Sequence, residues 1–172
     1  MFKTNSEQPQ QVSFAIPLGT KAHELARQYS QAVGNADRER SKVEIYLNCL
    51  AVSAVDFYMK FLGFETELSQ SNSQNKLMLQ FFIKADLLVT NIGRFKCIPV
   101  EENGEYGEIS DVSFERTGYI FVQLSKSRQE AVILGFTKTH QAKVDLNQLQ
   151  SVDDLIDYLI DLEEEPGARN TP

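Results

Sequence analysis

The side chains that most often carry catalysis or bind metals are few and widely separated in this chain. Its 172 residues include two histidines, His23 and His140, and two cysteines, Cys49 and Cys97. Neither pair has the spacing of a zinc site, and the sequence contains no Gly-x-Ser-x-Gly, no Gly-rich phosphate loop before Lys-Ser/Thr and no His-Glu-x-x-His. We therefore expect no catalytic residue, no metal site and no cofactor, and an enzyme is the less favoured class.

Carboxylates cluster in one internal segment. Glu101, Glu102, Glu105 and Glu108 follow one another closely, and carboxylate oxygens are ligands for hard cations such as calcium. The spacing is not that of an EF-hand loop, so a solvated acidic loop is the simpler interpretation.

Polar residues also occur inside a stretch that is otherwise apolar. Asn48 and Asp56 lie within residues 43–68, where a buried helix must find hydrogen-bond partners for them. One interpretation is a polar pocket between the helices and a sheet, shared with Tyr58 and Tyr119, as in a small-molecule-binding protein or an enzyme. The other is that both residues bond to loop backbone and fix the helix in register.

The last segment has the strongest charge pattern. Its apolar residues recur at helical spacing: Val152, Leu155, Ile156, Leu159 and Ile160. The other face is acidic: Asp153, Asp154, Asp157, Asp161, Glu163, Glu164 and Glu165. Acidic residues near a helix C-terminus oppose the macrodipole, so local stability does not explain them. We predict a docking surface that attracts a protein partner with a basic surface; the alternative is that the charges only keep the chain soluble.

The net charge of −7 is concentrated at that end of the chain. Residues 151–172 carry seven acidic side chains and one basic side chain. No basic cluster occurs along the sequence, so we expect no nucleic-acid partner. The first residues lack the apolar core of a signal peptide, and two cysteines are too few for a disulfide framework. Both features predict a cytoplasmic protein.

A long helix must position many of these groups. Apolar residues recur at i, i+3, i+4 and i+7 from Val43 onward, with Phe57 and Phe61 in the apolar stripe, and Gly63 is the expected stop. We predict a helix that is buried on several sides. Asp56 and Lys60 would each cost about 2.5–3.5 kcal/mol at the centre of a bilayer, which argues against a membrane span.

Shorter elements precede and follow this helix. We predict a strand over residues 12–16 that Pro17 ends, and a helix that Thr20 caps and that runs to about Val33. Residues 76–83 fit a short helix or a strand, and we favour the helix. In the C-terminal segment, Ser151 and Asp154 resemble a capping box that opens a helix to about Leu162.

Strand signals dominate from residue 85 onward. Residues 87–90 and 94–100 flank a tight turn at residues 91–93 and predict a hairpin. Pro99 indicates that the second of these strands lies at an edge or ends there. Residues 119–124 and 131–137 are apolar on both faces, which predicts a central hairpin joined by SKSRQ, and residues 143–146 form a last short strand.

Together these elements predict an α+β fold: an N-terminal helical hairpin packed on a mostly antiparallel sheet or small barrel, with a C-terminal amphipathic helix. We expect residues 1–11 to be disordered and residues 12–162 to form a single globular domain. Residues 163–172 are expected to form an acidic tail that frays.

Four segments also carry a family resemblance: FAIPLGTKAHELARQYS, YLNCLAVSAVDFYMKFLGFETEL, ADLLVTNIGRFKCIPV and GYIFVQLSKSRQEAVILGF. In this order they resemble a cyanobacterial family of unknown function, domain of unknown function 1822. These motifs are a patterned core without a catalytic signature, so no catalytic residue is carried over. Members tend to be encoded near alternative sigma factors and caspase-like proteins. The resemblance implies a non-catalytic regulatory or adaptor protein, anti-sigma-like in one version, with a sigma factor or a caspase-like protein as partner.

Overall fold

The strands of the main sheet come from both halves of the chain. The computed structural model describes residues 14–32, 38–68, 82–109 and 116–165. Five strands in this part of the chain form one sheet in the order β1-β6-β5-β3-β2, and only the β3–β5 pair is parallel. Their bounds are β1 (Ala15–Pro17), β2 (Asp86–Val89), β3 (Gly93–Glu101), β5 (Gly118–Leu124) and β6 (Glu130–Thr137).

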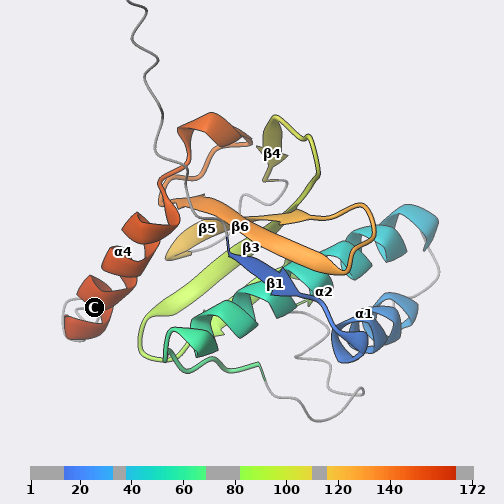
Figure 1. Cartoon of the computed structure of the whole chain (residues 1–172), viewed down its shortest axis with the longest axis horizontal. Coiled ribbons are helices and arrows are strands. Elements are labelled where there is room, and N and C mark those ends of the chain that lie inside the picture. Colours follow the sequence, from blue (N-terminus) through green and yellow to red (C-terminus); the bar gives the residue numbers. More distant parts are fainter. Residues whose placement is uncertain (1–13, 33–37, 69–81, 110–115, 166–172) are drawn as a thin grey trace, which may run out of the picture.

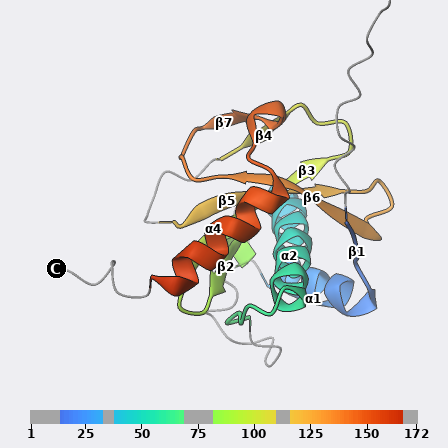
Figure 2. The same cartoon turned by 60° about the vertical axis from the view of Figure 1, so that its left-hand side comes forward.

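The helices cover one face of this curled sheet. Helix α2 (Arg38–Phe61) crosses the sheet, and α1 (Thr20–Gln31) packs against α2 (Figure 1). Helix α4 (Val152–Glu164) packs on β6 and shares the core on the α2 face (Figure 2). The protein is therefore α+β with a mostly antiparallel sheet, as predicted. The link between α1 and α2, residues 33–37, lies outside the described residues.

The opposite face of the sheet carries a small second layer. Strands β4 (Tyr106–Glu108) and β7 (Lys143–Asp145) pair antiparallel, and a 3₁₀ turn (Leu146–Gln148) follows β7 (Figure 2). The segment with Glu101, Glu102, Glu105 and Glu108, expected to be a loop, therefore contains a strand, which the sequence did not reveal. Gly107 is needed there because a Cβ at this position would lie 2.2 Å from the ring of Phe121.

Two apolar clusters fill the spaces between these layers. The larger cluster lies between the helices and the sheet and includes Leu50, Phe95 and Leu155. The smaller cluster lies under the β4–β7 layer and is centred on Phe121. Burial of a side chain of this size stabilises the fold by roughly 1.5–3 kcal/mol, so both layers contribute to stability.

Helix α2 is buried on several sides, as predicted. Cys49, Val52, Val55 and Met59 have no solvent exposure. The helix ends as expected at Gly63, which has a φ of 92°, and the N–H of Phe64 donates to the carbonyl of Met59 over 2.9 Å. Across the described helices, none is both long enough and apolar enough to cross a bilayer.

Some residues of the predicted apolar stripe lie outside the core. Val43, Phe57 and Phe61 are exposed, so placing them in the buried stripe was wrong. The helix is apolar around most of its circumference, and its sequence therefore does not show which side rests on the sheet.

Both predicted hairpins are confirmed. Strands β2 and β3 pair around residues 90–92, and β5 and β6 are interior strands joined by residues 125–129. The prediction that Pro99 marks an edge or an end was wrong, because β3 is interior and continues to Glu101. Pro99 is tolerated because β2 pairs only as far as Lys96, so the proline nitrogen faces the open side of β3.

Two helix starts differ in how well the sequence predicted them. Thr20 is the first helical residue of α1, and Gly19 occupies the N-cap without a side-chain bond, so the predicted Thr20 cap was wrong. The Ser151–Asp154 capping box of α4 is confirmed, and α4 continues to Glu164, two residues past its predicted end. Most of the predicted element at residues 76–83 lies outside the described residues; its last residues are helical.

Candidate functional site

The apolar side of α4 is fixed on the body of the protein. Leu155 and Leu159 are fully buried. The ring of Tyr158 stacks on Phe136 at 5.6 Å, and its hydroxyl donates to the carbonyl of Thr117 over 3.0 Å. These contacts fix the rotation of α4 about its own axis and leave its acidic side chains in solvent.

Every acidic residue predicted for a docking surface is exposed. These residues are Asp153, Asp154, Asp157, Asp161, Glu163, Glu164 and Glu165. The last turn of α4 contains no basic residue. Two hydrogen bonds from Ser151, from its hydroxyl and its backbone N–H, lower the pKa of Asp154, and the charge of Lys138 acts in the same direction. Among the described residues, we find no ion pair formed by the carboxylates of α4, so their charge is little compensated.

An exposed aromatic cluster lies at the end of α2. Phe61, at the end of α2, is 65% exposed, and Phe57 and Phe14 are each 45% exposed. The ring of Phe14 stacks on that of Phe61 at 5.3 Å and lies 6.2 Å from that of Tyr58. Burial raises the pKa of Tyr58, and the negative charge of Asp153 raises it further. Asp153 is therefore close to the base of the aromatic cluster.

We call the combination of these groups the acidic–aromatic surface. It comprises Asp153, Asp157, Asp161, Phe14, Phe57 and Phe61. The sequence indicated its acidic half only. The sequence signal for the aromatic half was the i, i+4 spacing of Phe57 and Phe61, which places both rings on one side of α2.

The four residues proposed for a polar pocket do not meet. The side-chain amide of Asn48 donates to the backbone carbonyl of Ile83 over 3.4 Å, which matches the structural interpretation of this residue. Asp56 pairs with Lys60 at 2.8 Å and accepts a hydrogen bond from Thr66.

The two tyrosines of this set lie on different sides of the sheet. Tyr58 belongs to the cluster beneath the helices, whereas Tyr119 belongs to the cluster under the β4–β7 layer, where its ring lies 5.7 Å from that of His140. The structure thus gives no shared cavity to the predicted set.

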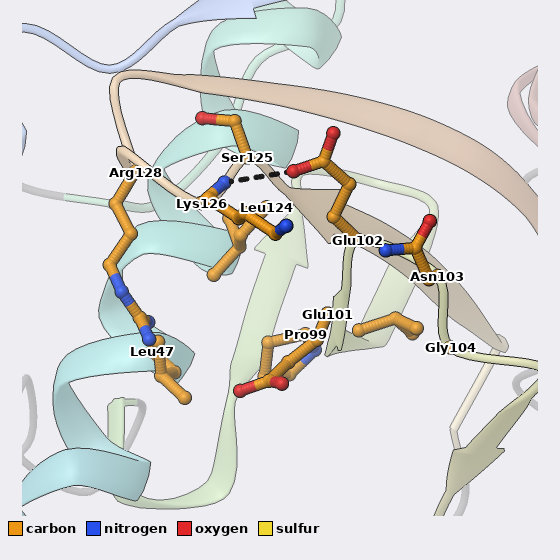
Figure 3. A pocket seen from close by; sticks show the side chains of 11 residues that line it. Leu47, Pro99, Glu101, Glu102, Asn103, Gly104, Leu124, Ser125, Lys126 and Arg128 are labelled. Carbon is orange, nitrogen blue, oxygen red and sulfur yellow. Dashed lines mark hydrogen bonds between the residues drawn. The ribbon is translucent and has the colours of Figure 1, made fainter.

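A cavity of about 420 Å³ opens elsewhere, between α2, the β3–β4 loop and the β5–β6 turn (Figure 3). Leu47, Val100 and Leu124 form its apolar wall. At its rim the backbone N–H of Lys126 donates to the carboxylate of Glu102 over 3.2 Å. Its charges are of both signs, and none of the four predicted pocket residues lines it.

The cysteines are buried, as predicted, and form no disulfide. Burial raises the pKa of the Cys49 thiol to about 12 and raises that of Cys97 well above its usual value. Both are therefore protonated at neutral pH, and a protonated thiol is a poor nucleophile. Within the described residues, no three His, Cys, Asp or Glu side chains gather as a metal site.

Comparison with known proteins identifies a family. A family model described as "Protein of unknown function (DUF1822)" matches residues 16–172. No curated protein and no solved structure matches the chain. The matched range includes both apolar clusters, α4 and most of the acidic–aromatic surface. The chain belongs to the DUF1822 family of proteins of unknown function.

Proposed function

We propose that this protein is a regulatory or adaptor protein that binds a protein partner, and that the partner presents a basic amphipathic helix to the acidic–aromatic surface. One observation carries the proposal. The carboxylates of α4 are exposed and little compensated, and Asp153 lies close to Tyr58, at the base of the exposed aromatic cluster at the end of α2.

The two halves of this surface have complementary physical roles. Exposed aromatic rings are typical anchors at interfaces, because burying them removes a large apolar area from water. Carboxylates that are little compensated attract a basic partner over about a Debye length, roughly 8 Å at physiological ionic strength, and speed its association. A basic amphipathic helix supplies both complements, an apolar face for the rings and cationic side chains for α4.

The acidic charge at the C-terminal end of α4 does not stabilise the helix. Asp161, Glu163 and Glu164 lie at the C-terminal end of α4, where negative charge opposes the helix dipole. The family's neighbourhood with sigma factors supports a narrower form of the proposal, an anti-sigma-like role in the cytoplasm.

Charge neutralisation at α4 tests the proposal. A variant with Asp153→Asn, Asp157→Asn and Asp161→Asn should lose partners that the wild-type protein captures from a lysate of its native host, with chemical cross-links from α4 mapping to a basic segment of each partner. The control variant carries Glu101→Gln, Glu102→Gln and Glu105→Gln. It changes the net charge equally but at exposed positions away from α4. If both variants capture the same partners as the wild type, the proposal is wrong.

A second variant tests the aromatic half. Phe61→Ser removes the most exposed ring of the cluster and should leave the unfolding temperature nearly unchanged. We expect it to weaken the captured complex about 10- to 100-fold, equivalent to about 1.4–2.8 kcal/mol. Val43→Ser removes an exposed apolar side chain from the other end of α2 and is the matched control. Equal effects of the two changes would mean that the aromatic cluster is not an anchor.

A further inference from the structure

A second cavity lies at the end of the molecule that carries α1 and the β5–β6 turn. Its volume is about 580 Å³, within the usual range for small-molecule sites. Helix α1, the segment leading into it, α2 and the β5–β6 turn border this cavity, which is wide open to solvent. Figure 1 shows α1 and this end of the sheet on the side opposite α4. The lining residues are Pro17, Leu18, Gly19, Thr20, His23, Arg27, Tyr46, Ser127, Arg128 and Gln129.

The charge of this cavity is opposite to that of the protein. Arg27, Arg128 and His23 line it, and no aspartate or glutamate does, although the chain carries a net charge of −7. Glu101 and Glu102 line only the neighbouring cavity of Figure 3. Arg128 lines both cavities, and in Figure 3 its side chain runs toward Leu47. The first turn of α1 adds a smaller positive contribution.

The polar groups of the cavity come from separate elements and are held in place. The Nδ1 atom of His23 on α1 lies 2.6 Å from the hydroxyl of Tyr46 on α2, so a hydrogen bond joins the two helices at the cavity wall. Thr20 and Ser127 contribute hydroxyl groups from opposite sides. Pro17, Leu18 and the ring of Tyr46 provide an apolar wall beside the cations.

The backbone at Arg128 adds a second, independent observation. Arg128 has a φ of 58°, in the left-handed region that glycine or asparagine normally occupies in hairpin turns. Its N–H donates to the carbonyl of Ser125 over 2.9 Å and closes the turn. An arginine here is less favourable for folding than glycine, and such strain is characteristic of functional positions.

We propose that this cavity binds a small phosphate ester, with the phosphate between Arg27 and Arg128 and the organic group against Tyr46 and Leu18. Guanidinium groups bind phosphate oxygens in pairs of parallel hydrogen bonds, and two arginines match the double negative charge of a phosphate monoester. The apolar wall offers a contact surface for the organic group of the ester. Inorganic phosphate has no such group and cannot use this wall. This site is independent of the acidic–aromatic surface.

Calorimetric titration of the full chain with three probes tests the ligand class. Adenosine monophosphate should bind, inorganic phosphate should bind more weakly, and adenosine should not bind measurably. Adenosine binding as tightly as its monophosphate would overturn the role of the cations. Succinate binding as tightly as the monophosphate would overturn the assignment of phosphate.

Three variants test whether the two arginines bind the phosphate. Arg128→Gly should weaken monophosphate binding at least tenfold while the unfolding temperature stays the same or rises, because glycine relieves the left-handed backbone. Arg27→Gln should weaken it several-fold. Lys126→Gln, in the same turn but lining only the neighbouring cavity, should leave binding unchanged. Equal affinities for the wild type and Arg128→Gly, or a loss in Lys126→Gln as large as in Arg128→Gly, would overturn the proposal.

Discussion

At the scale of single residues, the Asp86–Arg116 ion pair joins β2 to the start of β5. Both side chains are only 2% exposed, and the guanidinium donates to both carboxylate oxygens, over 2.8 Å and 3.3 Å. Two buried charges are favourable only as a pair, because burial removes the hydration of each charge and only the partner offsets that loss. The pair therefore links β2 to the segment before β5 across β3 and adds little net stability.

This argument predicts a non-additive result. Arg116→Met or Asp86→Leu alone should lower the free energy of unfolding by about 3–5 kcal/mol, since each leaves a buried charge without its partner. The double variant should be clearly more stable than the sum of the single effects implies. Urea denaturation of the four proteins measures this difference, and additive effects would show that the pair is not coupled.

The buried thiol of Cys49 predicts a dependence on alkaline pH. In the unfolded chain the thiol ionises near its usual pKa of 9.0, whereas in the folded protein its pKa is about 12. Unfolding therefore releases a proton between these values, so this contribution to stability is complete below pH 9 and is lost as the pH rises toward 12. Between pH 9 and pH 12, the free energy of unfolding of the wild type should fall by up to about 1.4 kcal/mol more per pH unit than that of Cys49→Ala. If the stability of the two proteins changed with pH in the same way, this prediction would be wrong.

At the scale of elements, the attachment of α4 to the sheet depends on one glycine. Gly135 has a φ of 150°, and a Cβ there would lie 2.2 Å from the carbonyl oxygen of Gln150. Gln150 exchanges backbone hydrogen bonds of 3.0 Å and 2.9 Å with Phe136, directly before the Ser151 cap of α4. The close approach of these two segments places the start of α4 on β6.

Gly135→Ala should consequently loosen α4 as well as destabilise the fold. We expect a loss of about 1–3 kcal/mol from the clash and the strained backbone. Hydrogen exchange should show lower protection at Phe136 and in the first turn of α4 than in β2 and β3. The control is Gly19→Ala, because nothing lies within 4 Å of a Cβ at Gly19. A uniform loss of protection would mean that this contact does not specifically hold α4.

The elements that sequence reasoning predicted well are those with local signals. The β2–β3 hairpin follows from its turn, where Asn91 and Gly93 both adopt positive φ, and the start of α4 follows from the capping box. The parallel β3–β5 pairing and the β4–β7 layer join residues far apart in the sequence, and no local pattern encodes them. Strand β5 is buried on both faces, so nothing showed that Tyr119 lies across the sheet from Tyr58.

The candidate sites, too, were predictable only where a local sequence pattern encodes them. The acidic face of α4 was predictable because its charges lie on one short helix with helical spacing. The aromatic half was missed because Phe14 and Phe61 come together only through the packing of β1 on β6 and of α2 on the sheet. The cationic cavity was missed for a similar reason, since Arg27 and Arg128 lie a hundred positions apart in the sequence.

At the scale of the whole molecule, α2 connects two surfaces of opposite charge. Tyr46, near its start, lines the cationic cavity, and Phe61, at its end, belongs to the acidic–aromatic surface. At a rise of about 1.5 Å per residue these positions are about 22 Å apart, nearly three times the Debye length of about 8 Å at physiological salt. Salt therefore screens each surface from the charges of the other.

This separation predicts that the two proposed activities are independent. Arg128→Gly should bind the monophosphate at least tenfold more weakly and capture the same partners as the wild type. The triple α4 variant should lose its partners and bind the monophosphate with unchanged affinity at physiological salt. Calorimetry and capture on both variants measure this, and at about 10 mM salt, where the Debye length reaches about 30 Å, the triple variant should bind the monophosphate more tightly. A change in monophosphate affinity at physiological salt would instead require α2 or the sheet to shift between two packed arrangements, because screened charges alone do not couple sites at this distance.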